Sequence, residues 1–345
     1  MPISSNNIII LTDYKGFFGS KQKSRIYRGG MDLEKIFNYF NDYGYTVKIM
    51  NFCNINYEEI VKEKPIILYT SSEDKEGFYK SFIEDIIYHL EQSNLLVIPK
   101  YVYLHTHNNK VAMELLRQRC KYNPIHTIHS KVFGSLDELK QNMHHFNYPV
   151  VIKSALGAMS KGVAKATNPK ELLSKAKKIS RSFDILHDIK ELLRKIKYGN
   201  KYKRESLYRK KFIVQNFIEG LENDWKVLVY DKKCYVLFRR NRKNDFRASG
   251  SGRFIFTKNI PSGILDFALK IKDYFNVPNI SLDIGYDGDK FHLLEMQFLY
   301  FGTLTIEFSP FYFELYNGKW LIKEEKSDLE KVYVDSIVKF LIENK

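Results

Sequence analysis

The chain has 345 residues, enough for two or three domains, and its content of 44% hydrophobic and 15% aromatic residues excludes a disordered protein. The formal net charge is +15, and the three cysteines are widely spaced without a C-x-x-C pattern, which argues against a disulfide framework and a structural zinc site. We therefore expect a reducing, cytoplasmic setting, without a membrane span, because no stretch approaches about 20 apolar residues.

The first hundred residues alternate short β-branched runs with amphipathic segments. Strands are predicted at NIIILTD, YTVKIMN, KPIILYTS and LLVIP, and helices over residues 32–43 and 77–92. This alternation favours a small parallel sheet, in which ligands bind beyond the carboxyl ends of the strands. The loop after the first strand is rich in glycine and cations, and predicts either a site for an anionic group or an ordinary surface loop. Its cations are Lys15, Lys21, Lys23, Arg25 and Arg28.

A domain boundary is predicted near residue 104, where Pro99 and the polar stretch HTHNNK occur. Beyond it we expect a helix over residues 110–119, a short strand around His126 and a helix over residues 136–144. The pattern thus changes from the strand and helix alternation of the first hundred residues.

The stretch YPVVIKSALGAMSKGV places Lys153 at the end of a strand, before Gly157 and Gly162. In a P-loop the glycines precede the lysine, so this order is wrong for that motif. Glycines allow a backbone to approach phosphates closely. By itself the stretch predicts either a flexible flap with a lysine beneath it or a plain strand and surface turn.

Residues 170–211 hold 15 Lys or Arg against 5 Asp or Glu, so +10 of the net charge lies in this segment. Leucine and isoleucine recur there at helical spacing, which predicts two amphipathic helices with basic outer faces. A solvated helix face explains this pattern, and a patch for a polyanionic substrate or an anionic membrane surface is the alternative. No nucleic-acid-binding module is visible, so we expect no specific nucleic-acid partner.

The last third of the chain predicts two or three antiparallel strands within KFIVQNFIEGLENDWKVLVYDKKCYVLFRRN, then a polar, glycine-rich loop. A helix over residues 263–274 follows, and then the hairpin NISLDIGYDGDKFHLLEMQ. The final helix is predicted to begin at Ser327, which is in a good capping position before Asp and Glu.

The hairpin places acidic residues in an apolar context. Glu295 and Gln297 point to the same face of one strand, and a carboxylate there is costly to bury unless it pairs with a cation or a metal. Oxygen ligands suit Mg²⁺. Asp283 shares this face only if the loop has an odd number of residues, which a turn with Gly288 in the left-handed conformation would supply. From these residues a metal site and a buried salt bridge both remain open.

Several features recur in a set order along the chain. They are Lys110, Lys153 with its glycines, VQNFIEG, an acid near Asp224, paired arginines, FRASGSG, Asp283, Glu295 and E-x-Q. This ordered set resembles the ATP-grasp superfamily over about residues 105–310, and most closely the group that includes the ribosomal-protein-modifying glutamate ligase.

The resemblance implies a fold of the α/β and α+β class, with a small parallel-sheet domain before a two-lobed ATP-grasp domain that has antiparallel sheets. The first domain would be residues 1–104 and the N-lobe residues 105–212, with the basic helices as an insertion at about residues 170–211. The C-lobe would be residues 213–345.

The resemblance also implies which residues bind ATP. Lys110 and Lys153 would contact its phosphates, beneath a flap that runs from Gly157 to Gly162. The strand that reads the adenine would consist of Gln215, Asn216, Phe217 and Ile218. Either Asp224 or Glu219 would bind the ribose, and position favours Asp224.

For the metal, the resemblance implies that Asp283 and Glu295 hold two magnesium ions. Gln297 stands where the family usually has Asn, and its longer side chain puts the ligand distance in doubt. Arg240 and Arg247 would steady the γ-phosphate and an acyl phosphate and, with Lys153, would be the catalytic residues.

The activity implied is that of an ATP-dependent ligase, in which a substrate carboxylate becomes an acyl phosphate and is then attacked by an amine, or less often a thiol. The alternatives are an ATP-grasp-like kinase that phosphorylates a hydroxyl, and a non-catalytic nucleotide-binding protein with a basic interaction surface. The charge favours a small acidic substrate, such as a sugar acid, or an acidic peptide. Many proteins of this fold pair up, so a homodimer stays open.

Overall fold

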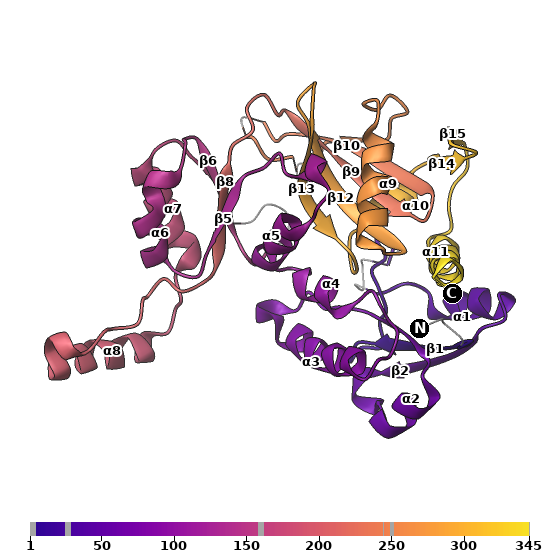
Figure 1. The fold of residues 1–345 in the computed structure, drawn as a ribbon, viewed down its shortest axis with the longest axis horizontal. Helices are drawn as coiled ribbons and strands as arrows, with labels where there is room; N and C mark the ends of the chain where they lie inside the picture. Colours follow the sequence, from indigo (N-terminus) through magenta and orange to yellow (C-terminus); the bar gives the residue numbers. More distant parts are fainter. Residues whose placement is uncertain (1–4, 25–28, 158–161, 244, 249–251, 345) are drawn as a thin grey trace. The chain divides into compact units, whose positions relative to one another are not determined.

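The computed structural model describes residues 5–24, 29–157, 162–243, 245–248 and 252–344. The chain divides into two compact units, the first made of residues 1–107 and 221–345 and the second of residues 108–220 (Figure 1). The predicted division into three domains, 1–104, 105–212 and 213–345, stays a prediction. In the described ranges, no helix is both long and apolar enough to cross a membrane.

The N-terminal part of the first unit contains the predicted parallel sheet, with its strands in the order β2-β1-β3-β4. The strands are β1 (Asn7–Thr12), β2 (Thr46–Asn51), β3 (Ile66–Tyr69) and β4 (Val97–Ile98). The helices around it are α1 (Leu33–Asp42), α2 (Tyr57–Glu63), α3 (Phe78–Gln92) and α4 (Tyr101–Thr106). Alternate residues of β1 enter two separate cores, as expected for a parallel sheet that is covered on both faces.

The C-terminal helix α11 (Leu329–Glu343) covers the same face of this sheet as α1. One core joins residues of β1 and α11, which are Ile8, Ile10, Val334, Ile337 and Leu341. The carboxylate of Asp328 caps this helix by accepting the N–H of Lys331, so the predicted cap at Ser327 is wrong by one residue. The Ser327 hydroxyl instead forms a hydrogen bond with the Tyr235 hydroxyl, which takes it away from the helix end.

The rest of the first unit is an antiparallel sheet of seven strands in the order β13-β12-β9-β10-β14-β15, with β11 paired to β10. The strands are β9 (Asn223–Tyr230), β10 (Lys233–Arg240), β11 (Phe254–Ile255), β12 (Asn279–Tyr286), β13 (Phe291–Gln297), β14 (Tyr312–Tyr316) and β15 (Lys319–Lys323). Helix α9 (Ile264–Phe275) packs against β9 and β12, and α10 (Leu304–Phe308) against β9 and β10 (Figure 1). The hairpin of β14 and β15 is not among the predicted elements.

The second unit contains an antiparallel sheet in the order β5-β8-β6-β7. Its strands are β5 (Ser130–Phe133), β6 (Val150–Ser154), β7 (Val163–Ala166) and β8 (Phe212–Asn216). Its helices are α5 (Lys110–Arg119), α6 (Leu136–Asn142), α7 (Pro169–Ser180) and α8 (Ile185–Tyr198). Helices α6 and α7 cover one face of this sheet, and α5 lies against β5 and β8 on the other (Figure 1).

The predicted strand around His126 is wrong. Residues Asn123–Ile125 form a single 3-10 turn, and the strand begins later, at Ser130. Pro124 explains the difference, because its ring fixes the backbone for a turn and it cannot donate a hydrogen bond to a neighbouring strand.

Candidate functional site

One face of the seven-stranded sheet changes from apolar to charged along its strands. At one end Leu228 and Tyr235 lie in a core with Ile306 of α10. Farther along the same strands, this face carries Asp224, Lys226, Arg239, Asp283 and Glu295, together with Leu237, and Gln297 lies on the same face of β13 in the row of Leu228. The register places Lys226 beside Asp283 and Asp283 beside Glu295, so cross-strand neighbours can interact directly. Four adjacent strands thus assemble one polar cluster.

A β-bulge puts Asp283 and Glu295 on a common face. The loop of the hairpin is Asp287–Lys290, which has an even number of residues, so the predicted odd turn is wrong, although Gly288 does have a positive φ of 102°. An even loop alone would place the two acids on opposite faces. The register shifts after Asp283 and leaves Leu294 as an extra residue, which restores the common face.

Arg239 is one of two largely buried cations of this cluster, with a side chain 12% exposed against 14% for Lys226. Its Nε and Nη2 donate to the two oxygens of Asp224 at 2.5 and 2.9 Å, and its Nη2 also lies 2.8 Å from Asp283 Oδ2. The Nζ of Lys226 donates to Asp283 Oδ1 at 3.3 Å. Two cations therefore neutralise two largely buried carboxylates, which is the condition under which such charges are tolerated in an interior.

The shared arginine moves the two carboxyl pKa values apart. Burial raises the pKa of Asp224 to about 6, and the negative charge of Asp283 adds to this against the opposing effect of Arg239. Burial also disfavours the charge of Asp283, but contacts with both Arg239 and Lys226 outweigh it and hold the pKa of Asp283 below its usual range. The carboxylate with two cationic partners is therefore the more acidic of the pair.

Replacing Asp224 by Asn is expected to change how the free energy of unfolding depends on pH. An acid whose pKa is raised by folding carries no penalty below its ordinary value of 3.8, a penalty that grows as the pH rises from there to about 6, and a constant penalty above that. The difference in unfolding free energy, wild type minus Asp224→Asn, should thus fall by up to about 3 kcal/mol between about pH 4 and pH 7, at 1.36 kcal/mol per pKa unit. Urea titrations measure it.

The control for this pH experiment is Asp289→Asn, because the Asp289 side chain is 85% exposed. Its difference from wild type should not change over the same pH range. A flat difference for Asp224→Asn as well would contradict the raised pKa of Asp224.

Glu295 and Gln297 are half-buried, and among the described residues neither side chain has an ion pair or a hydrogen bond. With Asp283 they offer the oxygen donors that Mg²⁺ prefers. Within the described part of the chain, no three His, Cys, Asp or Glu side chains lie close enough to form a metal centre by themselves. The donor set fits magnesium only if the ion competes with Arg239 and Lys226 for Asp283.

The two arginines predicted to be catalytic lie outside this set of contacts. Arg240 follows Arg239 on β10 and is exposed, so its side chain points to the opposite face. Arg247 pairs with Asp245, Nη2 to Oδ2, at 2.5 Å. The sequence analysis did not predict Arg239 as a site residue, although a signal was present. Residues two and four positions apart on a strand share a face, so Arg239 lies on the same face as the buried Tyr235, and Arg240 does not.

In the second unit, Lys110 meets the first glycine of the predicted flap. The Nζ of Lys110, which is buried, donates to the carbonyl of Gly157 at 2.6 Å. The N–H of Gly157 donates to Asn108 Oδ1 at 3.0 Å, and its φ of 112° is one that glycine adopts readily. Residues 158–161 of the flap lie outside the described residues. The structure thus places two predicted phosphate contacts side by side.

Lys153 and Gln215 lie on the same face of this second sheet. Lys153 pairs with Ile213 and Val151 pairs with Gln215, so strand alternation puts both polar side chains on the face away from α6 and α7. Gln215 is 5% exposed and Lys153 is half-buried. The predicted phosphate lysine and the first residue of the predicted adenine strand therefore face the same side.

The remaining residues of the predicted adenine strand lie at the end of β8 and just beyond it. Asn216 Oδ1 accepts the N–H of His129 at 2.6 Å, which fixes the amide. The ring of Phe217 lies under Lys165, whose Nζ is 3.8 Å from the ring centroid, and Ile218 is half-buried.

The basic loop after β1 is held by acids of its own unit. Glu330, which is 2% exposed, pairs with Lys21 at 2.5 Å, and Glu307 accepts the backbone N–H groups of Gln22 and Lys23. Lys21 is therefore not available for an anionic substrate group in this structure. Arg25 and Arg28, on which the prediction also rested, lie outside the described residues.

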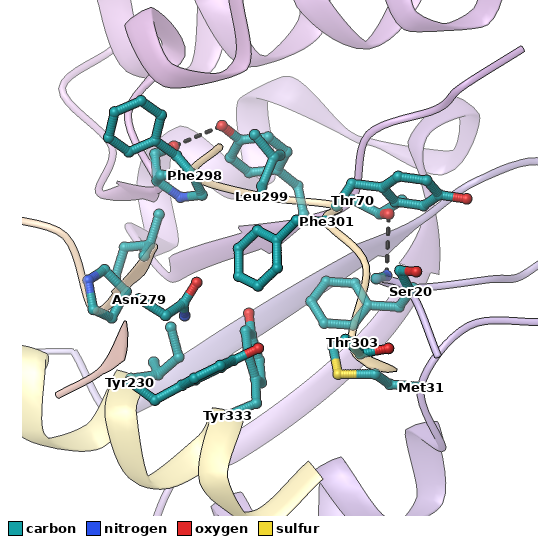
Figure 2. A pocket seen from close by; sticks show the side chains of 18 residues that line it. Ser20, Met31, Thr70, Tyr230, Asn279, Phe298, Leu299, Phe301, Thr303 and Tyr333 are labelled. Carbon is teal, nitrogen blue, oxygen red and sulfur yellow. Dashed lines mark hydrogen bonds between the residues drawn. The ribbon is translucent and has the colours of Figure 1, made fainter. Parts of the chain in front are cut away.

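A small hollow of about 50 Å³, open in part to solvent, lies in the first unit against the end of β9 at Tyr230 and the start of β12 at Asn279 (Figure 2). Its walls are mainly apolar and aromatic, with Phe298, Leu299 and Phe301 directly after β13 and Tyr333 from α11 (Figure 2). Asn279 of β12 also lines it, on the same strand face as Asp283. Ser281 lies between these two residues, and among the described residues its buried hydroxyl has no hydrogen-bond partner.

No protein-family model and no curated protein matches the chain in sequence. Solved structures do match it. D-cycloserine synthetase DcsG has a TM-score of 0.54 at 10% identity, covering 97% of this chain and 99% of that chain. ATP-grasp ligase PsnB, complexed with minimal precursor, Mg and ADP, has a TM-score of 0.53 at 11% identity, covering 99% of each chain. The RimK domain protein ATP-grasp from Sphaerobacter thermophilus has a TM-score of 0.51 at 11% identity, covering 96% of this chain and 99% of that chain.

These similarities, with the parallel N-terminal sheet and the two antiparallel sheets, show that the chain has the ATP-grasp ligase fold. The predicted fold class is confirmed. The narrower placement, in the group of the ribosomal-protein-modifying glutamate ligase, stays a prediction.

Proposed function

We propose that the protein is an ATP-dependent ligase that activates a substrate carboxylate as an acyl phosphate and joins it to an amine, giving ADP and phosphate. The fold supports the use of ATP, since PsnB, which has the same fold, was solved with Mg and ADP. The observation that carries the proposal is the placement of Asp283 between Glu295 and Arg239 on one sheet face, with Glu295 as its cross-strand neighbour and Arg239 as its ion-pair partner. Oxygen ligands for magnesium and a planar cation for phosphate oxygens are what phosphoryl transfer requires.

In the first unit, Asp283, Glu295 and Gln297 would hold the two magnesium ions, which neutralise charge on the β- and γ-phosphates when bound. Arg239 is oriented by its two hydrogen bonds to Asp224, and would present its guanidinium to phosphate oxygens. Arg240 and Arg247 remain candidates for contacts with the γ-phosphate and the acyl phosphate.

In the second unit, Lys110 and Lys153 would bind the α- and β-phosphates, and the segment from Gly157 to Gly162 would exclude water from the acyl phosphate. The adenine would be bound by Gln215, Asn216, Phe217 and Ile218.

For the ribose we propose Glu219 in place of Asp224, the residue that the sequence favours. Both oxygens of Asp224 accept hydrogen bonds from Arg239, whereas Glu219 is exposed just beyond β8. A ribose hydroxyl needs an accessible acceptor, and only Glu219 offers one without breaking a buried ion pair.

The chemistry follows from these contacts. A carboxylate oxygen of the substrate attacks the γ-phosphorus, ADP leaves, and the amine then displaces phosphate from the acyl carbon. We place this reaction in the cytoplasm, where ATP is available and where the three unpaired cysteines would stay reduced.

The test is to incubate the protein with Mg-ATP and pooled carboxylates, using hydroxylamine as the amine, and then with pooled carboxylates and pooled amines. We expect ADP, phosphate and a hydroxamate in the first reaction, and ADP and phosphate that require both pools in the second. Carboxylates labelled with ¹⁸O should transfer one labelled oxygen to phosphate, because the acyl phosphate is formed through that oxygen. Lys153→Ala is expected to abolish turnover, since it removes a phosphate contact.

The matched control is Lys131→Ala, on β5 of the same sheet, where the lysine is exposed. It should leave turnover unchanged. ADP without free phosphate, with the phosphoryl group on a hydroxyl, would instead establish a kinase. AMP and pyrophosphate would contradict the mechanism, and ATP binding without turnover across the pools would favour a non-catalytic nucleotide-binding protein.

A further inference from the structure

Helix α8 presents a stripe of apolar side chains to solvent. Six side chains on one side of it are between 48% and 74% exposed: Ile185, Leu186, Ile189, Leu192, Leu193 and Ile196. Their spacing of three and four residues along the 14-residue helix makes them one continuous band, which we call the α8 stripe. The helix stands away from the sheet of its own unit (Figure 1). A contiguous apolar band of this kind marks an interaction site, whereas single exposed apolar residues do not.

The polar side of α8, in contrast, is covered by its own chain. Glu191, on the side opposite the α8 stripe, is 1% exposed. Its carboxylate accepts hydrogen bonds from the Tyr202 hydroxyl at 2.6 Å, the Glu205 N–H at 3.0 Å and Arg194 Nη1 at 2.7 Å. The segment after the helix therefore folds back over its polar side. These contacts fix the rotation of the helix and keep the α8 stripe turned outward.

Cations border the α8 stripe on both sides. Residues 181–211 contain 11 Lys or Arg against 4 Asp or Glu, a net charge of +7. At about 100° per residue, Lys190 and Lys197 lie along one border of the stripe and Lys195 along the other. Lys190 and Lys197 are exposed. An apolar band flanked by lysines is the pattern of helices that lie in the headgroup region of anionic bilayers.

We propose that α8 binds to the surface of an anionic lipid bilayer, with the α8 stripe in the interface and the flanking lysines at the headgroups. The helix lies on the membrane and does not cross it. The inference is independent of the proposed ligase activity, because it uses none of the residues assigned to ATP.

A second copy of the chain fits the α8 stripe less well than a bilayer. Two segments of net charge +7 repel each other. The helix is about 21 Å long and about 10 Å wide, so its face offers a few hundred Å², against about 800 Å² per partner in a standard protein interface. A single convex helix also lacks the groove in which a partner helix or peptide docks. None of these objections applies to an anionic bilayer, because it is negatively charged, it extends beyond the helix, and it needs no groove.

The test is flotation of the full chain with vesicles of phosphatidylcholine, compared with vesicles in an about 2:1 mixture with phosphatidylglycerol. We expect binding to the anionic vesicles that is at least about tenfold tighter than to the neutral ones and that weakens with added salt. Leu186→Gln/Leu193→Gln should weaken binding by at least about tenfold, because two apolar side chains no longer enter the interface. Lys190→Gln/Lys197→Gln should weaken it by about tenfold or more.

Two matched controls keep the fold and change exposed positions elsewhere. Ile342→Gln alters an isoleucine of α11 that is 59% exposed, and Lys62→Gln/Lys64→Gln removes two exposed lysines at the end of α2. Both should bind as wild type does. Circular dichroism melts should match for all variants, since every altered side chain is at the surface.

Three results would overturn the proposal. The first is that wild type does not bind to the anionic vesicles. The second is that Leu186→Gln/Leu193→Gln binds as tightly as wild type, because charge attraction would then explain the binding without the α8 stripe. The third is a dimer in analytical ultracentrifugation that Leu186→Gln/Leu193→Gln converts to a monomer, because a second copy would then cover the α8 stripe.

Discussion

Replacing Arg239 by Met is expected to lower the free energy of unfolding by about 3 to 5 kcal/mol, the usual cost of removing one partner from a buried ion pair. Asp224 would lose its cation, whereas Asp283 would keep Lys226. The loss should be smaller at about pH 5 than at about pH 8, because Asp224 can become neutral by taking up a proton when the pH is low. Urea unfolding of purified variants at both pH values measures the effect.

The neighbouring Arg240 supplies the control. Arg240→Met alters the same residue type on the same strand, but the side chain is exposed, so the free energy of unfolding should stay within about 0.5 kcal/mol. A second variant, Arg239→Met/Asp224→Leu, should regain much of the stability, since an apolar pair of similar volume often replaces a buried ion pair without loss. Wild-type stability of Arg239→Met would show that this arginine does not neutralise the cluster.

Glu295→Gln is expected to lower the rate of ADP formation by at least about a hundredfold, because magnesium would lose a carboxylate ligand. The same variant should unfold at an unchanged or slightly higher urea concentration. Among the described residues Glu295 has no ion pair to lose, and its cross-strand neighbour Asp283 carries a like charge. Loss of activity without loss of stability is the expected signature of a ligand position. A magnesium titration of ADP formation measures the weaker binding.

Glu314→Gln is the matched control for this variant. Glu314 lies on β14 of the same sheet, and within the described part of the chain its side chain has a single, long ion-pair contact, 4.0 Å from Lys323 Nζ to its Oε2. Its rate and magnesium dependence should equal those of wild type. Full activity of Glu295→Gln would remove it from the metal site, and a parallel loss of stability would indicate a structural role instead.

The candidate site illustrates what a single strand pattern can and cannot predict. Alternation along β13 predicted that Glu295 and Gln297 share a face, and the register is consistent with this. It could not predict how Asp283 joins them, because that depends on the extra residue Leu294 opposite β12. A bulge leaves no reliable mark in a run such as HLLEMQ, where every residue suits a strand.

The two arginines of β10 show a second limit. The order of motifs predicts Arg240 as a phosphate-binding arginine, which stays a prediction, and it does not indicate that Arg239 is the arginine of the carboxylate cluster. Strand alternation separates adjacent residues, but the face on which a strand buries its apolar side is decided by its neighbours in the sheet. Arg239 pairs with Asp224 of the adjacent β9 and with Asp283 of β12, the next strand beyond it, and these two acids are 59 positions apart in the chain.

The sequence by itself determined the class of fold. Short β-branched runs between amphipathic helices favour a parallel sheet that is covered on both faces, because such runs have no polar side to expose, and the ordered motifs resemble the ATP-grasp superfamily. The same local periodicity predicted that residues 170–211 form amphipathic helices.

Only the tertiary structure decided how those local elements are used. It placed α11 on the N-terminal sheet, gathered Arg239, Asp224 and Asp283 from three strands, and buried Glu191 so that the apolar side of α8 faces solvent. The physical reason is the same in each case. Periodicity predicts which residues share a face of a helix or strand. Contacts between residues distant in sequence decide whether that face packs against another element, joins a polar cluster or is exposed to solvent.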